Sequence, residues 1–358
     1  MKRLFSGLFA AVLLISLTAC GNQSAEETFL AMDTAIRLTA HGGKAERAVE
    51  QGENQLMELE QLLSRTLEDS DVSRINAAAG EWTEVDVVTG KLVQAAAAYT
   101  GETGGAFDVT IAPVVAAWGF TTDTRQVPEA AELQRLLAAV GGEALQAERD
   151  ESEKDIFRVV CGKDQQIDLG GIAKGYASDR MADIFAVNEV VGGLAALGGN
   201  VLAYGTKADG SAWKVGVQDP KHPGDGSALV GIVELENAFA VTSGGYQRFF
   251  EEDGKTYHHI IDPATGYPAD SGLTSVTVVA PCARQRTGYE PVNGTMCDAY
   301  STALFVMGEE AALDFWRGSD REFELILVTE DDRVVVTDGI GEHFTFNEES
   351  ECHYEIVT

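Results

Sequence analysis

Six short β-rich segments follow one another between residues 193 and 280, and no helical pattern separates them. The expected helices are grouped before and after this stretch instead of alternating with its strands. Such grouping is typical of α+β proteins with largely antiparallel sheets. The expected strands are 193–204, 213–218, 229–235, 239–243, 257–261 and 273–280.

The rest of the chain supplies helices and further strands. Apolar residues at helical spacing, among many Glu and Gln, predict a long amphipathic helix at 44–63. The chain is long enough for one elaborate domain or for two closely packed lobes. Further helices are expected at 89–100, 128–140, 172–188 and 297–307, and further strands at 28–40, 157–161, 166–169, 324–328 and 334–337.

The first twenty residues have the pattern of an export signal. Lys2 and Arg3 precede an apolar run at 4–17, which is too short to span a membrane and suits the core of a signal peptide. Small residues before Cys20 look like a lipoprotein signal that is cleaved before that cysteine and lipidated on it. An ordinary signal peptide with an incidental cysteine is the alternative. We expect a signal peptide at 1–19, a lipidated Cys20 with a flexible tether at 20–27, and an extracytoplasmic, membrane-anchored protein.

Acidic residues dominate the charge of the chain. The 57 Asp and Glu residues against 26 Lys and Arg give a formal net charge of −31. A field of that sign repels nucleic acid, so we expect no nucleic-acid partner. It would also repel a polyphosphate ligand unless a bound cation or local donors offset it.

Four cysteines follow Cys20, and none has the spacing of a zinc site. Export permits disulfides. Cys282 and Cys297 bracket a loop that contains Gly, Pro and Asn, and we predict that they pair. Closing a loop of about 15 residues is worth roughly 3 kcal/mol if the effect is one of chain entropy. Cys161 and Cys352 could also pair, and the sequence leaves that open.

The segment DLGGIAKGYASD, residues 168–179, is the strongest local signal. A strand ends on Asp168, Gly170 and Gly171 make a turn, and Lys174 lies in the first turn of the next helix. Glycines let backbone groups approach a ligand, and a helix N-terminus suits phosphate. A plain strand–turn–helix junction with a solvated lysine is the alternative. The segment is neither a Walker A loop nor a GxGxxG fingerprint.

The segment CDAYSTALFVMG, residues 297–308, places Asp298, Ser301 and Thr302 on one face of a helix. One carboxylate with two hydroxyls, and no His or Cys, is a hard oxygen set that suits Mg²⁺ rather than zinc. Alternatively, Asp298 caps the helix and the hydroxyls form an ordinary polar stripe.

Three glycine-containing segments give weaker signals. GGAFDVTIAP carries Phe107 and Asp108, which could contact a ligand or serve as a core residue and a strand-end cap. LGGNVLAYG (197–205) could contact a ligand or form a tight strand crossing. TSGGYQRFF (242–250) could form a ligand wall or a hairpin turn.

The segment HHIIDPATGYP, residues 258–268, joins two histidines to a turn. Asp262 is followed by Pro and, after two residues, by Gly, which is sufficient chemistry for a β-turn. In the preceding strand, side chains alternate between faces, so His259 and Ile261 share one side while His258 lies on the other.

Together these segments resemble the ApbE-type FAD:protein FMN transferases. The match also includes Met32-Asp33-Thr34, the polar stretch 64–76 and the strand WKVGVQDP at 213–220. The landmarks occur in one order across almost the whole chain after Cys20, and a lipoprotein signal is common in this family. The resemblance implies a single two-lobed catalytic unit at residues 28–358.

In such an enzyme the FMN half of FAD moves onto a Thr or Ser hydroxyl of an exported flavoprotein as a phosphoester, and AMP leaves. The resemblance implies FAD contacts from Met32, Thr66, Ala106, Phe107, Asp108, Asp168, Lys174 and Ile261. It implies that Mg²⁺ is held by the Gly171 carbonyl, Asp298 and Thr302, with Ser301 beside them. The cation and Lys174 would neutralise a pyrophosphate that an acidic protein otherwise repels.

The resemblance places Ile261 on the flavin, and the shared strand face then brings His259 into the site. Histidine has an unperturbed pKa of about 6.5, which suits a proton acceptor for the attacking hydroxyl. Four features depart from the family pattern. Thr66 stands where an aromatic residue is common, Asp33 replaces a usual glycine, and Ser301 stands where relatives often have a small apolar residue. The stretch 281–298 is longer than usual, and we expect the predicted disulfide to hold this insertion.

Two other functions fit the same features. An FAD pyrophosphatase would use water in place of the acceptor hydroxyl and yield FMN and AMP. A flavin-binding lipoprotein would capture the ligand without chemistry. The transferase interpretation requires an exported flavoprotein partner with a modified Thr or Ser, which the sequence does not identify.

Overall fold

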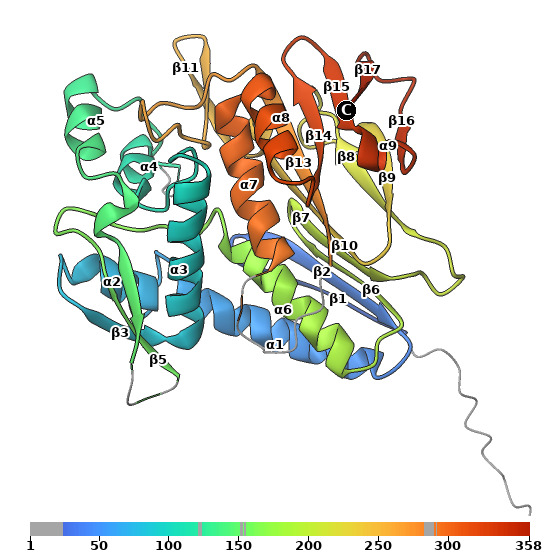
Figure 1. Ribbon diagram of the computed structural model, residues 1–358, viewed down its shortest axis with the longest axis horizontal. Coiled ribbons are helices and arrows are strands. Elements are labelled where there is room, and N and C mark those ends of the chain that lie inside the picture. The colour runs from blue at the N-terminus through green and yellow to red at the C-terminus, as the bar shows by residue number, and fades with distance from the viewer. Residues whose placement is uncertain (1–23, 121–123, 151–152, 154, 283–289, 291) are drawn as a thin grey trace, which may run out of the picture.

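The computed structural model describes residues 24–120, 124–150, 153, 155–282, 290 and 292–358 (Figure 1). Within this part of the chain, a nine-stranded sheet has the order β1-β2-β6-β7-β10-β13-β14-β15-β17. Its neighbouring strands are antiparallel except for β15 and β17, so the predicted α+β class with largely antiparallel sheets is confirmed. The strands are β1 (Ser24–Ala31), β2 (Thr34–His41), β6 (Gly192–Leu197), β7 (Asn200–Gly205), β10 (Ala238–Gly244), β13 (Leu273–Pro281), β14 (Glu324–Thr329), β15 (Arg333–Thr337) and β17 (His353–Val357).

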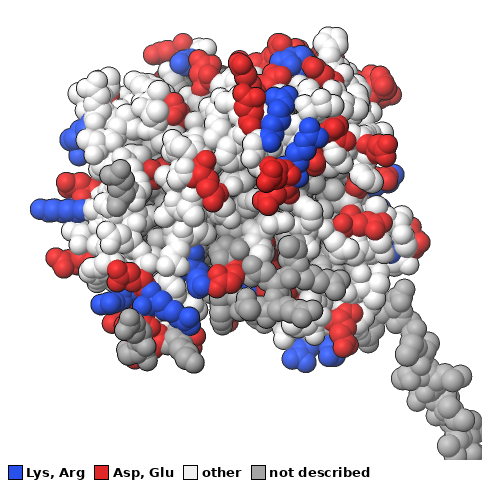
Figure 2. All heavy atoms as spheres, in the orientation of Figure 1, with Lys and Arg blue, Asp and Glu red and all other residues white. Residues whose placement is uncertain are grey.

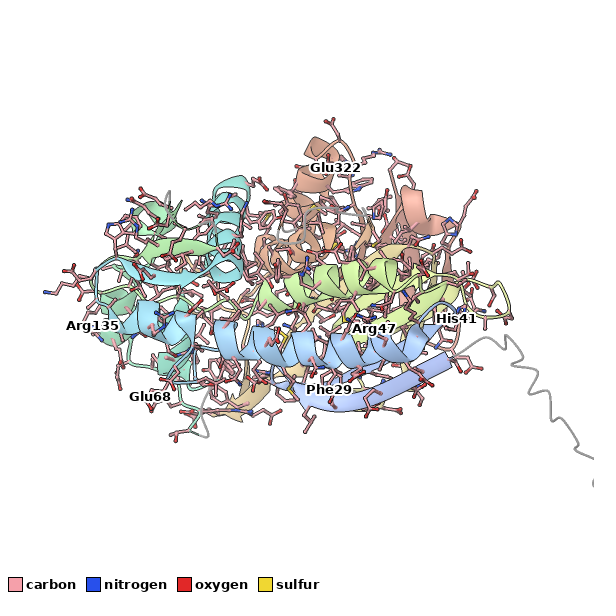
Figure 3. All side chains as sticks on the ribbon, turned by 90° about the horizontal axis from the view of Figure 1, so that it is seen from below. Phe29, His41, Arg47, Glu68, Arg135 and Glu322 are labelled. Carbon is pink, nitrogen blue, oxygen red and sulfur yellow. The ribbon has the colours of Figure 1, made fainter. Side chains whose placement is uncertain are left out.

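Three long helices cover one face of this sheet: α1 (Ala45–Leu63), α6 (Ala173–Val187) and α7 (Asn293–Met307). Figure 3 shows α1 lying along the β1–β2 hairpin. Ile36 and Leu38 of β2 point toward the helices and are fully buried, as are Leu56 and Leu59 of α1. Each such side chain contributes roughly 1.5–3 kcal/mol through apolar burial.

A three-stranded sheet packs on the opposite face of the large sheet. It consists of β8 (Trp213–Gln218), β9 (Leu229–Leu235) and β16 (Phe344–Phe346), in the order β16-β9-β8. Ala203, Ala240 and Val279 of the large sheet contribute to this second core, whereas their strand neighbours Leu202 and Phe239 contribute to the helix side. The strict alternation explains why both faces are apolar.

A second lobe lies beside the large sheet, at the left of Figure 1. It contains α2 (Asp71–Ala77), α3 (Val87–Glu102), α4 (Ala112–Trp118) and α5 (Ala130–Leu137), with a small sheet in the order β3-β5-β4. The remaining elements are β3 (Thr83–Asp86), β4 (Gln146–Arg149), β5 (Ile156–Val160), the hairpin β11 (Phe249–Glu252) and β12 (Lys255–His258), α8 (Glu309–Gly318), α9 (Asp338–Gly341) and the short 3₁₀ turns Gly142–Ala144 and Gly245–Gln247.

The segment expected as one strand at 28–40 is a hairpin. Met32 and Asp33 both have positive φ, at 52° and 59°, and form a two-residue turn of the kind that matches strand twist. The first strand begins at Ser24, and residues 24–27 pair with 38–41. These four residues were expected in the flexible tether, and the structure corrects that boundary because the hairpin gives their backbone groups partners.

Three other predicted strands also differ. The segment 193–204 is the hairpin β6–β7, which turns at Gly198 (φ +66°). The segment 166–169 does not pair with β5, and its single bridge joins Gln166 to Ile111. The strand expected at 257–261 ends at His258, so His259 lies just beyond β12.

The predicted disulfide between Cys282 and Cys297 is not formed, and neither is one between Cys161 and Cys352; all four residues are buried as thiols. Burial raises the pKa of the Cys297 thiol well above its usual range, and the nearby carboxylate of Asp179 on α6 raises it further. A disulfide needs Cβ atoms about 3.5–4.5 Å apart with a narrow range of dihedral angles. Sequence spacing does not fix that geometry. The insertion is therefore not held by a disulfide, and its residues 283–289 and 291 lie outside the described part.

The signal peptide and Cys20 lie outside the described residues. In the ranges that are described, no helix is long and apolar enough to cross a membrane. On the face shown in Figure 2, basic side chains lie singly or in small groups among acidic ones. Positive charge therefore does not gather into a broad patch on this face.

Candidate active site

A cavity of about 920 Å³ lies where the second lobe meets the end of the large sheet. Its walls come from the turn of the β1–β2 hairpin, the start of α6, one face of α7, the ends of β7 and β10, and the segment after β12. Of the predicted site residues, the structure brings twelve to this cavity: Met32, Thr66, Ala106, Phe107, Asp108, Asp168, Gly171, Lys174, His259, Ile261, Asp298 and Thr302.

The glycine turn before α6 forms one wall of the cavity. The Gly170 N–H donates to Asp168 Oδ1 at 2.8 Å, and Lys174 Nζ donates to the Gly170 carbonyl at 3.1 Å. A side-chain carbon at Gly171 would lie only 3.2 Å from Phe107 Cε2 and 3.9 Å from Thr302 Oγ1. The absence of that carbon leaves the Gly171 backbone open to the cavity beside Thr302.

Close packing of α6 against α7 brings Asp298 to this turn. A side-chain carbon at Gly175 would lie 2.3 Å from the Gly294 carbonyl oxygen and 2.6 Å from Asp298 Cβ. Any larger residue would force the helices apart. The Gly175 N–H instead donates to Asp298 Oδ2 at 2.8 Å, so the buried carboxylate of Asp298 accepts one of the unpaired N–H groups of the first turn of α6.

Asp179 fixes the start of α7. Its buried carboxylate accepts hydrogen bonds from the N–H groups of Val292, Gly294 and Thr295 and from the Thr295 hydroxyl. Burial raises the pKa of Asp179 to about 7, while these donors act in the opposite direction. Removal of the carboxylate would leave the four donors unpaired, so Asp179 holds α7 in the register that places Asp298 in the cavity.

The structure corrects the placement of Ser301, which does not line the cavity. Its fully buried hydroxyl donates to the Asp298 carbonyl at 3.0 Å and lies 2.8 Å from Ser243 Oγ. Ser243, at the end of β10, lines the cavity and lies 3.2 Å from Thr302 Oγ1. Positions i+3 and i+4 of one helix are separated by 100°, so Thr302 faces the cavity while Ser301 faces the sheet.

The oxygen atoms at this wall fit a magnesium ion. Asp298 supplies a carboxylate and Thr302 a hydroxyl, and Gly171, which lines the same cavity, has a backbone carbonyl. Mg²⁺ is usually held by one or two carboxylates together with substrate phosphates and water, and not by a dedicated cage of protein ligands. Among the described residues, no cluster of three or more His, Cys, Asp or Glu could hold a metal, which is compatible with a site of one carboxylate.

The two adjacent histidines have different surroundings. His259 lines the cavity, and its Nδ1 lies 3.2 Å from the Arg248 carbonyl. The ring lies deep in the fold although part of its surface is open to the cavity. Burial, followed by the charge of Arg248, lowers the pKa of His259 to about 3. His258 does not line the cavity; it packs edge-on against Phe305 of α7 and its Nε2 lies 3.1 Å from the Ala269 carbonyl.

Comparison with known proteins shows which family the chain belongs to. The sequence model of the ApbE family matches residues 32–327, which is most of the chain. The chain belongs to the ApbE family. It is 29% identical to the FAD:protein FMN transferase of Haemophilus influenzae, over 92% of this chain and 94% of that protein, and 33% identical to that of Treponema pallidum, over 80% and 78%.

Solved structures of the ApbE family share the fold. The ApbE protein from Thermotoga maritima superposes with a TM-score of 0.75 at 33% identity, covering 91% of this chain and 97% of that one. The flavinyl transferase ApbE from Pseudomonas stutzeri gives a TM-score of 0.74 at 28% identity, covering 90% and 97%.

In this member of the ApbE family, sequence reasoning did not single out Ser243 or Arg248. Both lie in TSGGYQRFF, for which a ligand wall and a hairpin turn were the alternatives, and both line the cavity. The exposed side chain of Arg248 donates to the Asp33 carbonyl at 3.5 Å. The available signal in the sequence was a hydroxyl, Ser243, before the paired glycines and an arginine, Arg248, after them. The sequence could not show that these residues lie near α7, because that proximity depends on the position of β10 in the sheet.

The other predicted contacts line the cavity in different ways. Met32 lies in the β1–β2 turn, where it has positive φ, and its N–H donates to Glu60 Oε1 at 3.1 Å. Asp108 is buried and accepts hydrogen bonds from the N–H and hydroxyl of Thr110. Thr66 is exposed at the rim, with its hydroxyl 3.0 Å from Ser64 Oγ. A small rim residue leaves that side of the cavity more open than an aromatic residue would.

Proposed function

We propose that this chain is a Mg²⁺-dependent FAD:protein FMN transferase, which moves the FMN part of FAD onto a Thr or Ser hydroxyl of an exported flavoprotein and releases AMP. One observation carries the proposal: a single cavity holds an uncharged histidine, the cations Lys174 and Arg248, and the oxygen set of Asp298, Thr302 and Gly171. The family supports the proposal, because its curated relatives are named FAD:protein FMN transferase.

Charge neutralisation is the first task of the site, because the protein has a net charge of −31. Gly171, Ala173 and Lys174 at the start of α6 line the cavity, so a pyrophosphate there would lie at the positive end of this helix, which favours anions. Lys174, in the first turn of that helix, adds a positive charge at the same place. A magnesium ion held by Asp298, Thr302 and Gly171 would supply further stabilisation of the charge on the leaving phosphate.

Proton removal is the second task. The acceptor hydroxyl attacks the phosphorus of the FMN phosphate, a new P–O bond forms, and the P–O bond to the AMP phosphate breaks. The hydroxyl proton passes to His259. If Nδ1–H of His259 donates to the Arg248 carbonyl, the free lone pair of the imidazole is at Nε2. That hydrogen bond also fixes the ring orientation, so the site supplies a positioned base of the kind worth roughly 10²–10⁴-fold in rate.

Intact-mass measurement tests the proposal. We expect that incubation with FAD, Mg²⁺ and an exported flavoprotein acceptor increases the acceptor mass by one FMN phosphoryl unit and releases one AMP. Omission of Mg²⁺ should abolish the increase. FMN and AMP without a change in acceptor mass would identify a pyrophosphatase instead, and unchanged FAD would identify a flavin-binding protein; either outcome contradicts the transferase proposal.

A lipid anchor at Cys20 is also part of the proposal. Only three residues separate Cys20 from the start of β1 at Ser24, so Ser24 would lie within about 14 Å of the membrane surface. Met32, in the turn directly after this eight-residue strand, lines the cavity. At about 3.4 Å per residue, the strand places Met32 at the cavity about 27 Å from Ser24, the residue nearest the anchor.

The anchor predicts how the protein distributes in cells. The full chain should fractionate with membranes and carry a mass increase corresponding to acylation at residue 20. Cys20→Ala should shift it to the soluble fraction without lowering the rate of FMN transfer to a soluble acceptor. Retention of Cys20→Ala on membranes would contradict the anchor and would leave the transferase proposal intact.

A further inference from the structure

Asn200 carries a buried amide nitrogen, Nδ2, whose partner is not found among the described residues. It is the first residue of β7, directly after the Gly198–Gly199 turn, and only 1% of its surface is exposed. Within the part of the chain that the structure describes, its Nδ2 has no hydrogen-bond partner. Asn200 is nevertheless one of the residues that line the cavity.

Strand geometry gives the direction of this side chain. Asn200, Leu202 and Tyr204 share one face of β7, and the last two belong to the core beneath the helices. Asn200 pairs with Val241 of β10, which also points to the helix side. The amide therefore faces the helix side of the sheet, where the cavity meets α6 and α7.

The same face carries the hydroxyl residues next to the proposed metal ligands. Ser243 lies two residues beyond Val241 on β10 and is a diagonal neighbour of Asn200, at a typical distance of about 7–8 Å. Ser243 contacts Thr302, which lies beside Gly171 at the start of α6. Asn200 is thus a neutral donor on the same face of the sheet as Ser243, next to the wall where a pyrophosphate would lie.

Burial of an unpaired amide is costly. A buried donor without a partner destabilises a folded protein, so such groups are rare and call for an explanation. A buried donor that faces a ligand cavity is explained if the ligand supplies the acceptor. The cations Lys174 and Arg248 line the same cavity and indicate that the acceptor is an anionic oxygen.

We propose that Asn200 Nδ2 donates a hydrogen bond to a phosphate oxygen of bound FAD. This assignment rests on the proposed FMN transferase function and adds a residue that holds the pyrophosphate against the start of α6. An uncharged donor suits this position, since it positions the phosphate without competing with Lys174 or repelling a cation at Asp298. Positioning of the reacting phosphate by such donors is a large part of phosphoryl-transfer catalysis.

Binding of FAD and its fragments to Asn200→Ala tests the assignment without turnover. Titrations of wild type and variant would use FAD, ADP, FMN and riboflavin as separate probes. We expect affinity for FAD, ADP and FMN to fall about 10-fold and affinity for riboflavin, which has no phosphate, to stay within about 2-fold. A similar loss for riboflavin would place the amide on the flavin ring and overturn the assignment. Unchanged affinity for all four probes would overturn it as well.

Two further variants separate this role from a structural one. Asn200→Asp keeps the shape but introduces a negative charge, so we expect a loss of at least about 100-fold for FAD and ADP and little change for riboflavin. Asn347→Ala is the control, because its Nδ2 already donates to the Leu229 carbonyl and it does not line the cavity; probe affinities should not change.

Thermal unfolding of the unliganded protein completes the test. Because the amide has no partner in the free protein, Asn200→Ala should leave the Tm of the unliganded protein unchanged or slightly higher, while FAD should raise the Tm of the variant less than that of wild type. A fall in Tm without a change in ligand affinity would show a structural role. Failure of the wild-type protein to bind FAD at all would contradict the proposed function itself. If FAD raises the Tm of wild type, FAD binding is established, and a negative result with Asn200→Ala then contradicts only the role of Asn200.

Discussion

His259→Ala should reduce FMN transfer by roughly 10²–10⁴-fold, which is the range for loss of a positioned general base, while FAD binding stays largely intact. The imidazole lines the cavity and is held by the Arg248 carbonyl. Its pKa, lowered chiefly by burial to about 3, keeps it uncharged near neutral pH. A pyrophosphate bound nearby would oppose the charges of Arg248 and Lys174 and thereby increase the basicity of the ring at the moment it must accept a proton.

The adjacent histidine is the matched control. His258 packs against Phe305 and its Nε2 meets the Ala269 carbonyl, so His258→Ala should lower stability by about 1–2 kcal/mol. Transfer per folded molecule should stay within a few-fold of wild type. The measurements are the single-turnover rate of acceptor modification and the Kd for FAD. Equal losses of rate in the two variants would contradict the assignment of the base to His259.

Asp298→Asn should abolish the response to Mg²⁺. The amide oxygen can still accept the Gly175 N–H, so the α6–α7 contact and the fold should persist. The change removes the one carboxylate of the proposed oxygen set, so we expect at least about a 100-fold loss of Mg²⁺ affinity and of transfer. Titration of Mn²⁺ by electron paramagnetic resonance, with ADP present as the phosphate ligand, measures metal binding independently of activity.

Two neighbouring residues of α7 make this prediction specific. Thr302 lines the cavity, so Thr302→Ala should weaken metal binding about 10-fold through loss of a ligand. Ser301 is buried behind Ser243, so Ser301→Ala should change metal affinity less than about 3-fold while costing about 1 kcal/mol of stability through its lost hydrogen bonds. If Ser301→Ala lost as much metal affinity as Asp298→Asn, Ser301 would be a metal ligand and its placement outside the site would be wrong.

Local patterns predicted the regular elements well. Strands β8 and β9 begin and end where the sequence indicated, α1 begins one residue later than predicted, and α6 is one residue shorter than predicted at each end. Amphipathic periodicity and β-branched runs are properties of residues close together in the sequence, so they can be recognised without the tertiary structure. The β1–β2 turn was missed because Met32 and Asp33 adopt positive φ, which non-glycine residues seldom do without support from the surrounding fold.

The order of motifs along the chain was sufficient to indicate the family, because each motif places particular functional groups on a local element. The sequence could not show which of these groups meet. Gly175 and Asp298 are 123 positions apart and come into contact only because two glycines let α6 and α7 pack closely. The sheet decided that Ser243 covers Ser301 and that the amide of Asn200 faces the cavity, and the helix packing left Cys297 as a buried thiol. Such contacts arise from long-range packing, which local residue patterns do not encode.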